Sequence, residues 1–188
     1  MRIFIFSVLY CLMVITVRSQ PCGTGLQSDT DWLVSTVQRK AAIYRKGEDV
    51  ILDNGLLRRV FRIMPNVVCI DYVNLTNGQQ LLRSVKPEAR LVLDGKGYNI
   101  GGLEGQRENA YLLPSWVDSM NTGKEDFRFV RYSITEVAPF LKWKRRTWAP
   151  GNSPGTGKAI SFEYASPLPV LKGLRVFVHY ELYDGLPL

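Results

Sequence analysis

The sequence predicts an all-β fold, an antiparallel β-sandwich with a short N-terminal helix and long loops. The first observation is a set of turn motifs, Asp53-Asn54-Gly55, Asn77-Gly78 and Asp94-Gly95, each of which lies between apolar runs. Asn-Gly or Asp-Gly in such a setting is the strongest short-range signal for a β-hairpin. The second observation is strict alternation over residues 174–183, where one face collects Leu174, Val176, Val178, Tyr180 and Leu182. Short strands at regular spacing with turns between them are typical of a sandwich.

The predicted elements follow in order along the chain. A short helix is expected over residues 31–39, with Asp29 or Thr30 as its cap. The predicted strands cover residues 56–63, 67–75, 79–83, 89–93, 127–137, 159–164 and 174–183. Residues 101–124 form a long connection. The turn at Asp184-Gly185 is typical of a chain that leads into another strand, so we expect a sandwich truncated at its C-terminal end, or a last strand that pairs with a partner.

The first nineteen residues predict a secretory signal peptide. Arg2 precedes an apolar run over residues 3–17, and Val17 and Ser19 supply small residues before a cleavage site at Ser19/Gln20. A membrane anchor is the alternative, but a run of about 15 residues is shorter than the roughly 20 that span a bilayer. We therefore expect a secreted, extracellular protein with a leader over residues 20–30, a sandwich domain over residues 31–188, and no membrane span.

The charge of the chain bears on its partners. The formal net charge is +7, and losing Arg2 and Arg18 with the signal leaves +5 for the mature chain. A mildly basic exported protein favours extracellular glycans or acidic matrix polymers. Nucleic acid is not an expected partner, because no binding motif accompanies the charge. The oligomeric state stays open.

Two cysteines remain once Cys11 leaves with the signal. In an oxidising compartment, Cys22 and Cys69 predict one disulfide. Closing a loop of that length could stabilise the fold by about 4 kcal/mol. The alternative is a buried free thiol at Cys69 and an unpaired Cys22.

Four segments carry a resemblance to a known family: VILDNGLLRRVFR at 50–62, RSVKPEAR at 83–90, YNIGGL at 98–103 and VHYELYDGLPL at 178–188. Together they resemble the N-terminal β-supersandwich domain of secreted α-galactosidase-like glycoside hydrolases, over residues 31–188. The resemblance implies a galactose-mutarotase-like sandwich of the supersandwich type. In that family a separate (β/α)8 barrel supplies the catalytic aspartates, so the resemblance transfers no catalytic residue to this chain.

The residues themselves also offer no defined catalytic or metal site. A glycosidase needs two positioned carboxyl groups, and the spacing of the acids in the long connection singles out no pair among Glu104, Glu108, Asp118, Glu125 and Asp126. His179 is the only histidine in the sequence. Zinc therefore lacks a set of ligands, and any Ser-His-Asp triad would have to use His179. We expect His179 to be a strand residue satisfied by Glu181 or by the backbone, and we expect no cofactor.

Two surface features remain as candidate sites. Four cations and two indoles interleave at Lys142, Trp143, Lys144, Arg145, Arg146 and Trp148. They could grip an acidic glycan, or they could be a strand end whose tryptophans are core and whose cations are solvated. Asn74-Leu75-Thr76 is an N-glycosylation sequon beside a predicted hairpin turn, so we expect Asn74 to carry a glycan.

These observations favour a secreted non-catalytic β-sandwich protein, a component of an extracellular matrix or of a secretion, with glycan binding as an open possibility. The alternative is the N-terminal accessory domain of an incomplete α-galactosidase-like glycoside hydrolase. A third hypothesis is a freestanding lectin that uses Trp143 or Trp148.

Overall fold

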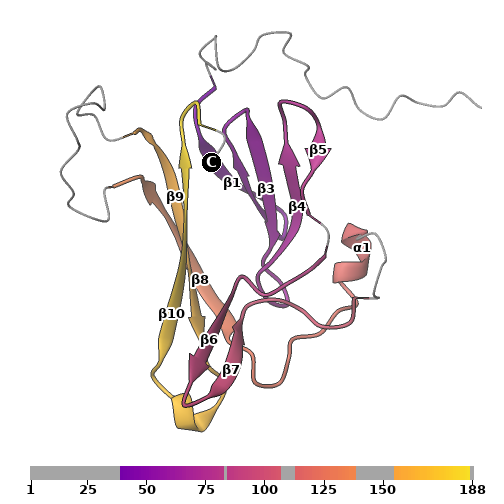
Figure 1. Cartoon of the computed structure of the whole chain (residues 1–188), viewed down its shortest axis with the longest axis vertical. Coiled ribbons are helices and arrows are strands. Elements are labelled where there is room, and N and C mark those ends of the chain that lie inside the picture. Colours follow the sequence, from indigo (N-terminus) through magenta and orange to yellow (C-terminus); the bar gives the residue numbers. More distant parts are fainter. Residues whose placement is uncertain (1–38, 83, 107–112, 139–154, 187–188) are drawn as a thin grey trace, which may run out of the picture.

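The protein is an antiparallel all-β sandwich, as the sequence predicts (Figure 1). The computed structural model describes residues 39–82, 84–106, 113–138 and 155–186. Within these ranges the strands form one five-stranded, one three-stranded and one two-stranded sheet. No helix in this part of the chain combines the length and the apolar character needed to cross a membrane.

The five-stranded sheet is a meander in chain order. It contains β1 (Ala42–Lys46), β2 (Asp49–Asp53), β3 (Leu57–Arg62), β4 (Val68–Asn74) and β5 (Gln79–Gln80). The predicted turns at Asp53-Asn54-Gly55 and Asn77-Gly78 both connect paired strands, so these two hairpins are confirmed. The sequence analysis assigned no strand to residues 42–46 or to residues 49–53. Four of the five residues of β1 are exposed, so its sequence does not mark a buried face.

A bulge interrupts the pairing of β3 with β4. Val60 lies opposite Asp71, whereas the next residue, Phe61, lies opposite Cys69, so Ile70 is the extra residue. A bulge of this kind lets two consecutive side chains face the same side of a sheet. Ile70 and Asp71 both reach the outer face of the sheet, while Cys69 belongs to the core between the sheets.

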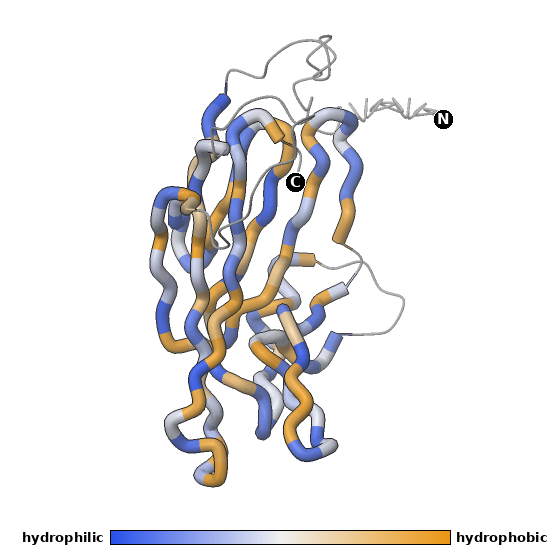
Figure 2. The backbone as a smooth tube through the Cα atoms, turned by 60° about the vertical axis from the view of Figure 1, so that its left-hand side comes forward, coloured by the Kyte–Doolittle hydropathy of each residue, from blue (hydrophilic) through white to orange (hydrophobic). Residues whose placement is uncertain are grey.

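The three-stranded sheet has the order β10-β9-β8, formed by β8 (Arg128–Glu136), β9 (Gly157–Ala165) and β10 (Arg175–Tyr183). A 3-10 turn, η1 (Pro169–Leu171), lies between β9 and β10. The alternation predicted over residues 174–183 is realised in β10, and Figure 2 shows the same alternation of hydropathy along the strands.

The remaining elements lie below and beside these sheets. β6 (Ala89–Leu93) and β7 (Lys96–Ile100) form the predicted hairpin at Asp94-Gly95, where both turn residues have positive φ angles of 49° and 79°. Positive φ at both positions is what a type I′ turn requires. The short helix α1 (Pro114–Val117) lies within the long connection, and the sequence analysis did not predict it.

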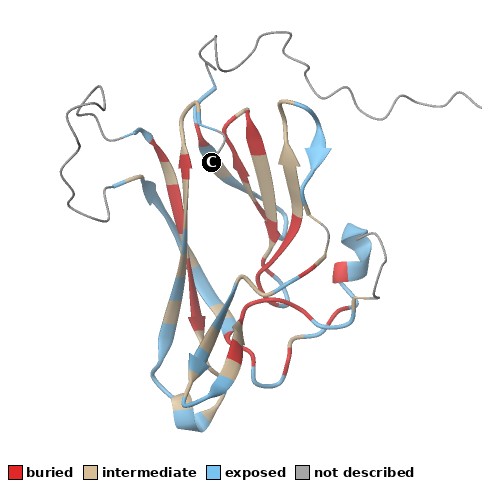
Figure 3. Ribbon diagram, in the orientation of Figure 1, coloured by how far each residue is buried: buried red, intermediate tan, exposed pale blue. Residues whose placement is uncertain are grey.

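The main core lies between the five-stranded and the three-stranded sheets, whose facing sides carry the buried residues (Figure 3). Phe61 of β3 and Phe162 of β9 are fully buried, and their ring centroids are 5.2 Å apart. Tyr180 of β10 packs against both of these rings. Aromatic pairs of this kind add to the stabilisation that comes from buried area.

A second, smaller cluster lies on the other side of β4. Its buried members are Val68, Ile70, Val85, Leu103, Val117 and Met120. Val117 belongs to α1, so this cluster attaches the long connection to the outer face of the five-stranded sheet. The predicted signal peptide, the leader and the predicted helix over residues 31–39, apart from Arg39, lie outside the described residues.

Candidate functional site

The outer face of the five-stranded sheet carries a hollow of about 660 Å³. It is lined by residues from all five strands and from the start of α1: Tyr44, Lys46, Asp49, Ile51, Arg58, Val60, Ile70, Asp71, Gln80 and Pro114. We call these ten residues the outer-face hollow. The face combines an aromatic ring, an aliphatic floor and charged groups of both signs.

Strand register explains how residues distant in sequence meet there. Tyr44 lies opposite Ile51, Ile51 lies opposite Val60, and Val60 lies opposite Asp71. Cross-strand neighbours in antiparallel sheets have Cβ atoms roughly 5 Å apart, so these four side chains form one row across the sheet. The bulge in β4 is what brings Asp71 into this row beside Ile70.

The polar groups at one end of the hollow are held in place by hydrogen bonds. Gln80 Nε2 donates to Asp71 Oδ1 over 2.6 Å, and Gln80 Oε1 accepts from the amides of Tyr72 at 3.2 Å and Leu82 at 3.1 Å. Arg58 Nη2 lies 3.5 Å from the other carboxylate oxygen of Asp71. These contacts leave Arg58 and Asp71 partly exposed and fix their orientation toward the hollow.

The opposite end of the hollow is organised by Arg62, although Arg62 does not line it. Its guanidinium pairs with Asp49 and also donates to Asp118 Oδ1 over 2.5 Å. The hydrogen bond with Asp49 is the main cause that raises the pKa of Arg62 above its ordinary value. Arg62 therefore connects β2, through Asp49, with the C-terminal end of α1, through Asp118.

The exposed ring of Tyr44 completes the hollow. Tyr44 is 45% exposed, and it lies beside Ile51 on the same face. An aromatic face attracts the weakly positive C–H groups of a sugar ring, while carboxylates, amides and guanidinium groups bond its hydroxyls. A few fixed polar groups around an apolar floor are typical of small-ligand sites.

A different group of polar residues lies buried between the two large sheets. Glu88, whose side chain is 2% exposed, accepts hydrogen bonds from Arg59 Nη2 at 3.2 Å, from the Cys69 amide at 3.2 Å and from the Tyr180 hydroxyl. Arg59 Nε lies 3.3 Å from Cys69 Sγ. The Arg59 guanidinium also lies over the rings of Phe61 and Tyr180, 4.7 Å from each centroid. We call Arg59, Cys69, Glu88 and Tyr180 the interior cluster.

Burial dominates the electrostatics of the interior cluster. Burial raises the pKa of Glu88 above 4.5, and the hydrogen bond from Tyr180 and the charge of Arg59 offset this only in part. Burial also raises the pKa of the Cys69 thiol and of the Tyr180 hydroxyl. The nearby Tyr164 hydroxyl is buried and has no hydrogen-bond partner in the part of the chain that the structure describes.

A raised pKa on a glutamate is also what a glycosidase general acid needs. Glu88, however, does not line the outer-face hollow, and its oxygens already bond three partners. A general acid must lie within reach of the sugar oxygen that it protonates. The interior cluster therefore has the character of a structural network.

The interior cluster also explains what the family-like segments do in the fold. Arg59, Glu88 and Tyr180 come from three of the four segments that carry the resemblance. In the fourth segment, a Cβ on Gly102 would lie 2.7 Å from Pro87 Cα, so this close approach requires glycine. Asn54 Nδ2 donates to the carbonyls of Tyr183 at 2.9 Å and Leu186 at 2.6 Å, which joins the first segment to the last. The resembling residues therefore meet inside the molecule.

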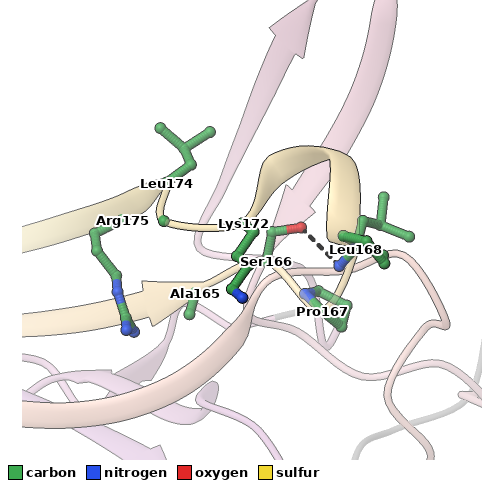
Figure 4. A pocket seen from close by; sticks show the side chains of 9 residues that line it. Ala165, Ser166, Pro167, Leu168, Lys172, Leu174 and Arg175 are labelled. Carbon is green, nitrogen blue, oxygen red and sulfur yellow. Dashed lines mark hydrogen bonds between the residues drawn. The ribbon is translucent and has the colours of Figure 1, made fainter.

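Two further hollows lie away from the outer-face hollow. One of about 430 Å³ lies in the loop between β9 and β10, where the Ser166 hydroxyl accepts a hydrogen bond from the Leu168 amide (Figure 4). Its lining contains prolines and two cations, Lys172 and Arg175, without an aromatic ring. The other, about 270 Å³, lies beside Trp116 of α1. Neither combines an aromatic ring with a set of fixed carboxylates.

The acids of the long connection have separate positions. Glu125 pairs with Lys96 at 2.8 Å, and Asp118 pairs with Arg62. Glu104 and Asp126 are brought together, because a Cβ placed on Gly123 would touch both carboxylates. Neither of these two residues lines the outer-face hollow or the two further hollows described above. Glu108 lies outside the described residues.

The other predicted sites have mixed outcomes. His179 lies exposed on β10, with Nε2 3.5 Å from Glu181 Oε1. Cys69 carries a free, buried thiol and Cys22 lies outside the described residues, so their disulfide stays a prediction. Asn74 ends β4, and its Oδ1 accepts from the Thr76 amide at 3.0 Å and from the Thr76 hydroxyl at 2.6 Å; its glycan likewise stays a prediction.

The cationic cluster also stays a prediction, because Lys142, Trp143, Lys144, Arg145, Arg146 and Trp148 all lie outside the described residues. The outer-face hollow, by contrast, was not predicted. It depends on register across five strands and on one bulge, and the alternation of single strands does not contain this information.

Comparisons with known proteins find no match, so a functional inference has to come from the geometry of the structure. A scan against protein-family models finds no match, and searches of the curated proteins and of the solved structures find none either. The likeness to α-galactosidase-like glycoside hydrolases therefore depends on the four short segments alone.

Proposed function

We propose that this is a secreted, non-catalytic β-sandwich protein of an extracellular matrix or a secretion, and that it binds glycans in the outer-face hollow. The single observation that carries the proposal is the exposed ring of Tyr44 on the same face as Arg58, Asp71 and Gln80. Hydrophobic contact on a ring together with directed hydrogen bonds is the combination that a sugar requires.

The hollow suits a sugar better than it suits an ion. Its charges are balanced, since Lys46 and Arg58 are offset by Asp49 and Asp71. A site for a single anion or cation would collect charge of one sign. Carboxylates that already face guanidinium groups accept hydrogen bonds from hydroxyls, and the exposed guanidinium of Arg58 can donate to them.

Secretion is the second part of the proposal, and sequence features support it. The arrangement of residues 1–19 is that of a signal peptide. The sequon at Asn74 lies at the end of β4 beside the turn into β5, where a modifying enzyme could reach it. Both features support secretion, and a secreted protein would meet extracellular glycans.

Binding to a glycan array, with the full chain expressed through a secretory pathway, tests the proposal. We expect Tyr44→Ala to weaken binding roughly five- to tenfold, because an aromatic contact contributes about 1 kcal/mol beyond its area. Gln80→Ala should weaken binding as well, because it releases Asp71 from its fixed orientation. Trp116→Ala is the matched control, because it removes another exposed aromatic ring that lies outside the outer-face hollow.

Two outcomes would count against this site. An absence of binding to any glycan would remove the function. Binding that Tyr44→Ala leaves unchanged, but that Trp143→Ala or Trp148→Ala abolishes, would move the site to the cationic cluster and support the lectin hypothesis instead.

The alternative is an accessory domain of an α-galactosidase-like glycoside hydrolase. It is favoured by the way in which three of the resembling segments meet through Arg59, Glu88, Tyr180 and Asn54. A transcript whose reading frame continues past Leu188 into a barrel would support it. Turnover of a galactoside by the purified chain, lost in Glu104→Gln or Asp126→Asn, would overturn the non-catalytic proposal.

A further inference from the structure

β10 is an edge strand whose second side has no strand partner in the part of the chain that the structure describes. It runs nine residues, from Arg175 to Tyr183, and pairs on one side with β9 without a break in register (Figure 1). A long, regular edge presents a row of unpaired N–H and C=O groups, which is a template for pairing with another strand.

The other three edges of the two larger sheets are less suited to such pairing, and the strands of the third sheet, β6 and β7, have only five residues each. β5 has two residues and β1 has five. β8 has nine residues, but its pairing with β9 shifts between Phe129 and Arg131. Short edges and bulges are the devices that prevent pairing between sheets. Only β10, among the described edges, is both long and regular.

Hydrogen bonds at the end of β10 show which of its residues point outward. The Asp184 amide donates to the Thr156 carbonyl over 2.8 Å, so Asp184 faces the β9 side. The preceding Tyr183 carbonyl points away from β9, because it accepts from Asn54 Nδ2. Since these directions alternate along a strand, the outward N–H and C=O groups belong to Arg175, Phe177, His179 and Glu181.

We infer that two copies of this chain pair antiparallel through β10, with Val178 of one copy opposite Val178 of the other. The Tyr183 carbonyl is already occupied by Asn54, so the available edge runs from residue 175 to residue 181, and Val178 is its centre. In this register Arg175 lies opposite Glu181 of the second copy, and Phe177 lies opposite His179 of the second copy. Each of these pairs occurs twice.

The side chains support this register. Arg175, Phe177, His179 and Glu181 lie on the same outer face of the sheet, and opposite charges directly across a strand pair are favourable. Phe177 is 59% exposed, and pairing would cover it. A register centred on His179 would place Arg175 opposite Tyr183 and would lose the charge pairing.

The inference goes beyond glycan binding and does not depend on it. Light scattering on the secreted full chain, after size-exclusion chromatography, measures the mass directly. We expect a mass twice that of one chain. Arg175→Glu and Glu181→Arg should each weaken the dimer by about tenfold or more, because each sets two like charges opposite one another. The double variant should recover it, because the charges are opposite again.

A proline variant tests the backbone hydrogen bonds. Phe177→Pro removes an outward N–H group and leaves the ladder to β9 intact, so it should give a monomer. Ile134→Pro is the matched control. It makes the same change on the outer edge of β8, where Val137 N donates to Gly157 and even-numbered residues therefore face away from β9.

Circular dichroism confirms that each variant is folded before its mass is interpreted. A wild-type chain that stays monomeric up to its solubility limit would overturn the inference. A dimer that persists in Phe177→Pro, or one that the folded charge-reversed double variant fails to restore, would overturn it as well.

Discussion

Glu88 is the residue on which the interior of the sandwich depends. It accepts hydrogen bonds from Arg59, from Tyr180 and from the Cys69 backbone while almost completely removed from water. A buried ion pair is weak evidence of net stabilisation, but removing one partner leaves an uncompensated charge. Glu88 therefore has a large effect on stability whether or not the protein binds a ligand.

The raised pKa of Glu88 predicts a specific pH dependence. A carboxyl group whose pKa is higher in the folded state than in the unfolded state stabilises the fold fully below its unfolded value, near 4.5, and this contribution is lost as the pH rises through the folded value. Glu88→Gln cannot ionise. Relative to this variant, the wild-type free energy of unfolding should fall as the pH is raised from 4 through the folded value.

Chemical denaturation of both proteins across this pH range measures the difference. Glu48→Gln is a suitable control, because Glu48 is exposed and pairs with Arg45 at 3.4 Å on the surface. A wild-type curve parallel to that of Glu88→Gln would show that Glu88 does not titrate with a raised pKa.

Among the elements, the hairpin between β2 and β3 has a role that its turn motif does not reveal. The motif Asp53-Asn54-Gly55 predicts the turn correctly, but Asn54 is fully buried and bonds four backbone groups. Two of these belong to Leu56 and Leu57 in the turn, and two belong to Tyr183 and Leu186 at the end of the last hairpin. The side chain thus holds the end of β10 against the five-stranded sheet.

Asn54→Ala should destabilise the protein by about 3 kcal/mol, because buried backbone groups would lose their partners. Asn77→Ala changes the equivalent residue of the exposed β4–β5 turn, where Asn77 Oδ1 accepts from the Gln79 amide at 2.9 Å. Asn77→Ala should lower the free energy of unfolding by well under half of the amount expected for Asn54→Ala. Equal shifts in denaturation midpoint would show that Asn54 acts only as a turn residue.

The sequence predicts those elements whose structure is determined by residues close together in the chain. Asp94-Gly95 predicts its hairpin because few residues tolerate positive φ at two adjacent positions. β1 was missed because four of its five residues are exposed, and α1 was missed because four residues are too short for a helical pattern. The outer-face hollow and the interior cluster were missed because most of their members come from strands whose pairing register the sequence does not state.

At the scale of the whole molecule, the predicted Cys22–Cys69 disulfide concerns how the segment before β1 would be attached. Cys69 is a buried member of the interior cluster, and its Sγ atom lies beside Arg59. A bond to Cys22 would bring the leader to this depth. The predicted disulfide would therefore fix the path of the leader as well as stabilise the fold.

Mass spectrometry of the secreted protein tests the bridge. In denaturant without reductant, we expect iodoacetamide to add no mass, because Cys22 and Cys69 would be joined. After reduction, two additions are expected, and the midpoint of unfolding should fall by an amount equivalent to roughly 3–4 kcal/mol. Labelling of both thiols without reduction would leave Cys69 as a free thiol in solution.

The bulge in β4 has a consequence for how the chain tolerates changes in length. Because Ile70 is the extra residue, Cys69 and Tyr72 both reach the interior although three positions separate them. Deleting Ile70 itself would remove the bulge and restore regular alternation, so the residues on both flanks would keep their present sides. The loss would fall on the outer face, where Ile70 lines the hollow and belongs to the second buried cluster, while Cys69 and Tyr72 would stay on the interior side.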